Sequence, residues 1–152
     1  MIESCLRAAL LASAHVVALV VDRISPQPLP QAETLPAVTV KKISDIPIAR
    51  SQRGRSGLSD ARLQVDAWAA TLLEAQGVAD SICDLLDPSW NDPMAHRAPG
   101  VPLYIGAGSR MDWARVMNQQ DFDEPDVQDA GDPAIRYHRV STDFLVRYAR
   151  ES

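Results

Sequence analysis

The chain has 152 residues, of which 46% are hydrophobic and 23% charged, as is typical of one globular domain that buries a core. Its formal net charge of −5 argues against a general nucleic-acid-binding surface, which is normally net basic. Aromatic residues make up only 5% of the chain, so we expect a single domain over residues 1–152 with a mainly aliphatic core.

The first elements expected are a helix, a connector and a strand. Apolar residues recur at helical spacing over 2–14, and the β-branched residues 16–21 fit either a further helical turn or a bend. Prolines at positions 26, 28, 30 and 36 exclude a regular helix and a central strand, which leaves an extended connector. Residues 37–44 then alternate between polar and apolar, as a strand does.

Residues 58–86 change their hydrophobic period partway and form the clearest pattern in the sequence. Polar and apolar residues alternate over 61–68, which predicts a half-buried strand. From Thr71 onward the apolar residues follow a helical stripe that ends at Asp87-Pro88. We therefore expect a strand that leads into an amphipathic helix with almost no loop.

The strands expected at 37–44 and 61–68 flank a basic loop over 47–57 and should pair antiparallel. The loop carries Arg50, Arg53 and Arg55, two glycines and no acidic residue. One interpretation is a solvated hairpin tip, as most such loops are. The other is a contact arm for an acidic partner or for nucleic-acid phosphates.

The last third of the chain predicts further strands separated by irregular or charged segments. Residues 88–102 are rich in proline, 103–105 and 110–117 resemble strands, and 135–148 alternate well. Residues 119–132 suggest an acidic hairpin loop because no base compensates their acids: Asp121, Asp123, Glu124, Asp126, Asp129 and Asp132. The expected fold is α+β, with two helices packed on one face of a mainly antiparallel or mixed sheet of four to five strands with long hairpin loops.

No motif in the sequence indicates catalysis, a metal or a cofactor. The acidic segment departs from a calcium-binding loop because position 125 is proline and position 126 is not glycine. Cys5 and Cys83 lie in helical patterns among apolar neighbours, so we expect buried free thiols. The apolar run 10–21 is interrupted by polar residues and is too short to cross a bilayer, so we expect a protein made in the cytoplasm and no membrane contact.

Several segments resemble the tail-completion, or tail terminator, family of long-tailed bacteriophages and gene-transfer particles. They are Gly57-Leu58 with Ala61–Ala69 and the Ala-rich helix, the C-terminal Arg139–Tyr148, and the N-terminal Ile2–Leu11 with Asp22–Ile24 and Leu35–Val38. The resemblance covers most of the chain in the same order, except from residue 88 to about 109.

The resemblance implies a structural virion protein and no enzyme. It implies a homo-hexameric ring that caps the tail tube, ends tube polymerisation and joins the head–tail connector, with DNA passing through its lumen without sequence-specific binding. The ring's partners would be the tail tube protein and the connector or stopper protein. The basic loop (Arg50, Arg53, Arg55) and the acidic segment (Asp121, Asp123, Glu124, Asp126) would be its contacts with neighbours, partners or lumen DNA.

Two other interpretations remain open. A head–tail adaptor or stopper protein is also small and ring-forming, and the 61–86 pattern is the only feature that separates it from a terminator. A small hydrolase or ligand-binding domain belongs to a different class, and it lacks support from a nucleophile–base pair or an apolar pocket signature in the sequence.

Overall fold

The computed structural model of this chain describes residues 2–29, 34–48, 50–51, 54–55, 57–95, 97, 100–125 and 136–150. The helices are α1 (Ile2–Leu11), α2 (Ala14–Val20), α3 (Leu72–Leu86) and a short 3-10 helix η1 (Pro88–Trp90). The strands are β1 (Ile24–Pro26), β2 (Ala37–Pro47), β3 (Arg50–Ser51), β4 (Gly54–Arg55), β5 (Leu58–Ala69), β6 (Tyr104–Gly106), β7 (Ser109–Pro125) and β8 (Arg136–Arg150).

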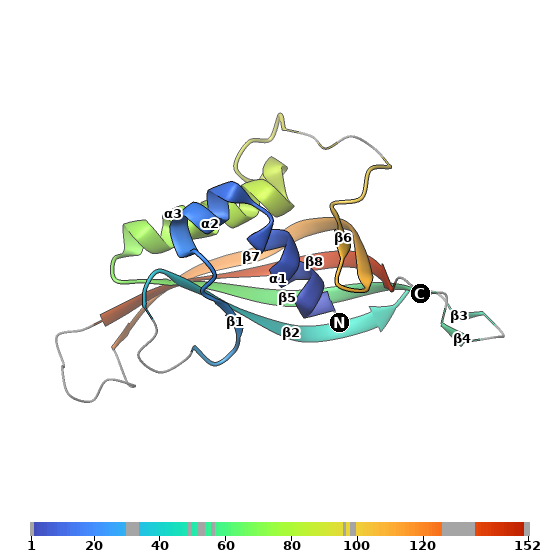
Figure 1. Ribbon diagram of the computed structural model, residues 1–152, viewed down its shortest axis with the longest axis horizontal. Helices are drawn as coiled ribbons and strands as arrows, with labels where there is room; N and C mark the ends of the chain where they lie inside the picture. Colours follow the sequence, from blue (N-terminus) through green and yellow to red (C-terminus); the bar gives the residue numbers. More distant parts are fainter. Residues whose placement is uncertain are drawn as a thin grey trace.

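Six strands form one sheet in the order β1-β2-β5-β8-β7-β6, and β3 pairs with β4 in a separate small hairpin. Only β1 and β2 run parallel, while the other neighbours are antiparallel. All three α-helices lie on one face of the sheet (Figure 1). We call this the helix face and the opposite one the open face. The α+β class is confirmed, although the expected four to five strands and two helices were too few.

The N-terminal helical region divides into α1 and α2, which meet at an angle of 90°. Ser13 is the cause, because its Oγ caps α2 by accepting a hydrogen bond from the Val16 N–H at 3.4 Å. The sequence pattern was compatible with either a helical turn or a bend at residues 16–21, and the structure shows the helix α2 there. Within the described residues no single helix is long and apolar enough to cross a membrane; α1 and α2 reach the threshold only as a bent pair.

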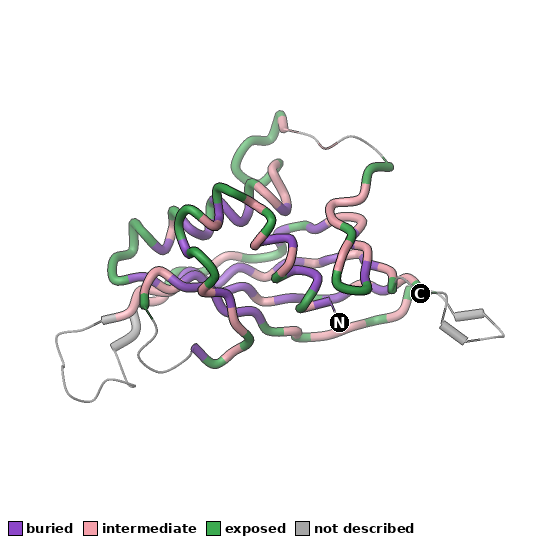
Figure 2. Tube along the Cα trace, viewed as in Figure 1, coloured by how far each residue is buried: buried purple, intermediate pink, exposed green. Residues whose placement is uncertain are grey.

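The strand-to-helix segment has the form that its pattern predicts. β5 ends at Ala69, and Thr71, still in an extended conformation, caps α3. Its Oγ1 accepts a hydrogen bond from the Glu74 N–H at 3.2 Å. The apolar stripe of α3 packs on β5, β7 and β8 (Figure 2). The core between helices and sheet is aliphatic with one phenylalanine, as the low aromatic content predicts: Leu6, Leu10, Val38, Leu63, Val65, Ile82, Leu86, Val140, Phe144 and Val146.

Both cysteines are free and buried, as predicted. Burial, with a smaller contribution from the nearby carboxylates of Asp80, Asp84 and Asp87, raises the pKa of the Cys83 thiol to about 12. The thiol therefore stays protonated and packs as a small apolar group.

The acidic segment is the main correction to the predicted elements. Residues 119–125 were expected in a loop, but they belong to β7, which pairs with β8 from Ser109–Arg150 to Pro125–Arg136. The long antiparallel pairing with β8 overrides the low strand propensity of aspartate, and the side chain of Asp121 is exposed to solvent. Residues 126–132 lie outside the described residues.

Candidate assembly surfaces

The structure places the two predicted charged regions at opposite ends of the sheet. Arg50 and Arg55 lie in the β3–β4 hairpin, which follows the end of β2, while Asp121, Asp123 and Glu124 lie near the far end of β7 (Figure 1). The 15-residue strand β8 joins these ends. At about 3.3 Å per residue it spans roughly 45 Å.

The basic and acidic regions are therefore not brought together within one copy of the chain. Arg53 and Asp126, which the sequence analysis also named, lie outside the described residues, and of the others only the Asp121 side chain is described. Asp121 is exposed and accepts a weak hydrogen bond from Gln76 Nε2 at 3.4 Å.

The open face carries a cluster built around a buried carboxylate. Asp66 is fully buried, and Oδ2 accepts a hydrogen bond from Arg139 Nη1 at 3.3 Å and another from the Gln27 side chain. The Arg139 guanidinium also lies over the rings of Trp68 and Phe122, at 5.2 and 4.4 Å from their centroids. Four of these residues come from β5, β7 and β8, so the cluster fixes the register of three strands on this face.

A second cluster lies toward the other end of the open face. Arg147 donates two hydrogen bonds to Asp60, at 3.0 and 3.1 Å, and these bonds raise its pKa above the ordinary value. Its guanidinium lies 4.9 Å from the centroid of the Trp113 ring, and that of Arg115 lies 5.4 Å from the same centroid. The open face is therefore a surface of paired charges and aromatic rings, which differs in character from the aliphatic helix face.

The two outer edges of the sheet are open along part of their length. β1 pairs only with Val38–Val40 of β2, and β6 pairs only with Ser109–Met111 of β7. Among the described residues no further strand lies beside 41–47 of β2 or 113–125 of β7. Apolar side chains lie on both open edges, with exposed fractions of 63% for Ile46 and 54% for Met117. An unpaired strand edge presents backbone N–H and C=O groups with which a strand of another chain can pair.

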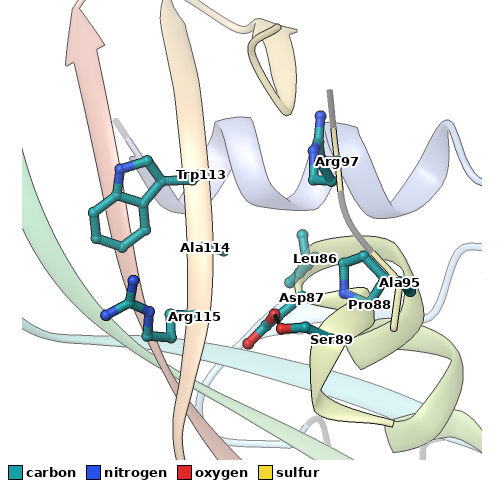
Figure 3. A pocket seen from close by; sticks show the side chains of 9 residues that line it. All are labelled: Leu86, Asp87, Pro88, Ser89, Ala95, Arg97, Trp113, Ala114 and Arg115. Carbon is teal, nitrogen blue, oxygen red and sulfur yellow. Dashed lines mark hydrogen bonds between the residues drawn. The ribbon is translucent and has the colours of Figure 1, made fainter. Parts of the chain in front are cut away.

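Asp87 occupies one point on the open edge of β7. Its Oδ2 accepts a hydrogen bond from the Val116 N–H at 3.0 Å, and its Oδ1 accepts one from Ser89 Oγ at 2.6 Å. A cleft of about 250 Å³ lies beside it, and Figure 3 shows Trp113 and Arg115 directed to the opposite side of β7. Both carboxylate oxygens are thus engaged, and Asp87 acts as a cap on the strand edge.

The described residues contain no cluster of three or more His, Cys, Asp or Glu side chains that could hold a metal. The arrangement that they do form is suited to contacts between proteins. The described residues form a sheet with one helix-covered face, a charged and aromatic open face and two partly open edges.

Comparison with known proteins identifies the family. The profile of the family described as tail completion protein gp17 matches residues 4–149, and the chain belongs to this family of structural tail proteins of virions. A solved structure titled "Virion of native gene transfer agent (GTA) particle" contains a chain of the same fold, with a TM-score of 0.63 and 14% identity over 97% of this chain and 93% of that one. No match is found among curated protein sequences.

Proposed function

We propose that this protein forms a ring, of six copies, that caps the tail tube, ends tube polymerisation and provides the surface that joins the head. The observation that carries the proposal is the family match over residues 4–149. The similarity to a chain of a gene transfer agent virion supports the same assembly context. The partners would be the tail tube protein on one side and the connector or stopper protein on the other.

The two different open edges of the sheet support a ring that closes through unlike surfaces. A heterologous contact joins one face of a copy to a different face of the next, and it produces a closed ring when the rotation is suitable. Basic residues at one end of the sheet and acidic residues at the other give each copy two unlike ends. Arginines of the 47–57 segment would then contact a neighbour, the tube or the phosphates of DNA in the lumen.

Deleting the gene from the genome that encodes the particle tests this function. A terminator stops polymerisation, so its loss should give tail tubes of uncontrolled, excessive length that remain separate from heads. Supplying the gene in trans should restore the normal length. A head–tail adaptor is the second candidate within virion assembly, and its loss would leave tails of normal length without heads. Electron microscopy of the tails distinguishes these outcomes.

A further inference from the structure

We infer that neighbouring copies join along their sheet edges, with residues 41–47 of β2 in one copy pairing antiparallel with residues 117–122 of β7 in the next. The inference rests on the proposed ring and specifies its interface. Within this pairing Lys42 lies opposite Asp121. The occupant of each open edge is therefore a second copy of the same chain.

The strand directions within the sheet favour this pairing. β2 is antiparallel to β5, β5 to β8, and β8 to β7, so β2 and β7 run in opposite directions. When a rotation places a second copy so that the sheet continues, β2 meets the neighbour's β7 in antiparallel orientation. This is the contact that a heterologous ring requires, because the two edges are different surfaces.

The backbone groups needed for the pairing point outward at both edges. Val38 N–H donates to Arg23 at 2.8 Å and Val40 C=O accepts from Gln27 at 3.2 Å, so these alternate residues of β2 turn their backbone away from β5. The next residue in that series is Lys42. Antiparallel ladders alternate between bonded and non-bonded pairs. The Val40–Val65 pair is non-bonded, the Val65–Thr142 pair is bonded, and the Thr142–Gln119 pair is again non-bonded. The backbone of Gln119 therefore points away from β8, toward the open edge. Two residues further along β7, the backbone of Asp121 points the same way.

Side-chain chemistry selects the register. Lys42 pairs with Leu63 and Asp121 with Val140, so both lie on the helix face, where directly opposite residues of an antiparallel pair must lie together. Opposite charges then face each other. With the bulge at residue 43 allowed for, Ile46 falls opposite Asn118 and next to the exposed Met117.

The neighbouring registers are less favourable. A shift of two residues in one direction sets Lys42 opposite Asp123, and the same shift brings Asp45 opposite Asp121, two like charges. A shift in the other direction sets Lys42 opposite Gln119 and loses the charge pair.

At one end of the proposed pairing the limits of the two open segments agree with each other. The open part of β2 ends at Pro47, which has no N–H to donate. The open part of β7 begins after Val116, whose N–H is already bonded to Asp87. In the proposed register these two ends meet, so no backbone donor is left without a partner at this point.

Disulfide trapping in assembled particles tests the pairing. In the Lys42→Cys/Asp121→Cys variant the two cysteines come from adjacent copies, and a bonded antiparallel pair holds its Cα atoms about 5.5 Å apart, within the range that a disulfide spans. Mild oxidation should produce a ladder of linked chains on a non-reducing gel. Cys5 and Cys83 are buried and contribute no background. The control variant Lys41→Cys/Asp121→Cys should give no ladder, because Lys41 pairs with Gln64 on the open face.

Each outcome decides the inference. Rings at the tail end without a ladder would overturn the edge pairing and leave the proposed function intact. Dimers from Asp121→Cys alone would indicate a β7–β7 contact and would also overturn it. Absence of the chain from the tail end would refute the function itself. A charge exchange tests the pairing independently of disulfide geometry. The single variants Lys42→Asp and Asp121→Lys should each fail to form rings, and the double variant should form them again. A double variant as defective as the single variants would contradict the pairing.

Discussion

Replacing Asp66 with Ala is expected to destabilise the fold by about 3 kcal/mol, because loss of one partner of a buried ion pair leaves the other charge uncompensated. The Asp66 side chain is fully buried, and that of its partner Arg139 is 19% exposed. The substitution also removes the carboxylate that accepts hydrogen bonds from Gln27 and Gln64. For a chain of this length the midpoint of thermal unfolding should fall by roughly 6–12 °C.

The matched control is Asp143→Ala, which breaks an ion pair on the same face. Asp143 Oδ2 lies 2.9 Å from Arg62 Nη2, but the Arg62 side chain is 48% exposed. Solvent screens such a pair, so this substitution should cost below about 1 kcal/mol. Urea unfolding followed by circular dichroism measures both variants. An equal loss of stability in the two would refute the view that the Asp66 cluster anchors three strands of the open face.

Three further predictions concern the loop, the strand edge and the core thiol. The triple substitution of Arg50, Arg53 and Arg55 with Ala should reduce the yield of infectious or transducing particles while the purified protein folds normally; full tail length and full particle yield would refute the contact role. Asp87→Ala frees the Val116 N–H at the strand edge and should increase self-association in light scattering, whereas Asp84→Ala, one turn of helix earlier, should not. Cys83 has its pKa raised from 9.0 to about 12. The unfolded chain therefore releases this proton first, and the stability that the thiol contributes is present below pH 9 and lost as pH rises from 9 to 12. In denaturant unfolding, the free energy of unfolding of Cys83→Ala should fall less steeply with pH between 9 and 12 than that of the unsubstituted protein. An unchanged dependence on pH would contradict the assignment.

Elements with a strong period were predictable from sequence. The alternation over 61–68 and 135–148 gave β5 and β8, because each strand buries one face under the helices. The stripe after Thr71 gave α3 for the same reason. The missed element β1 has three residues, too few for a period, and it exists because the longer strand β2 supplies its hydrogen bonds. The extent of β7 was missed because its acids resemble a loop until the pairing with β8 is known.

The candidate surfaces were only partly accessible to sequence reasoning. The charged residues near 50–55 and 121–126 were found by composition, and their positions at opposite ends of the sheet follow only from the topology. The Asp66–Arg139 cluster was missed because its members lie on different strands, although Asp66 and Arg139 sit at polar positions of alternating strands. The open edges could not be predicted, since they depend on how little of β2 and β7 the short strands β1 and β6 cover.

Electron cryo-microscopy of the head–tail junction of the particle tests the central claim most directly. The proposed function predicts density for this fold in a closed ring on the last layer of the tail tube, on the side toward the head. Density for the chain within the connector, or outside any ring, would contradict the assignment as a tail terminator.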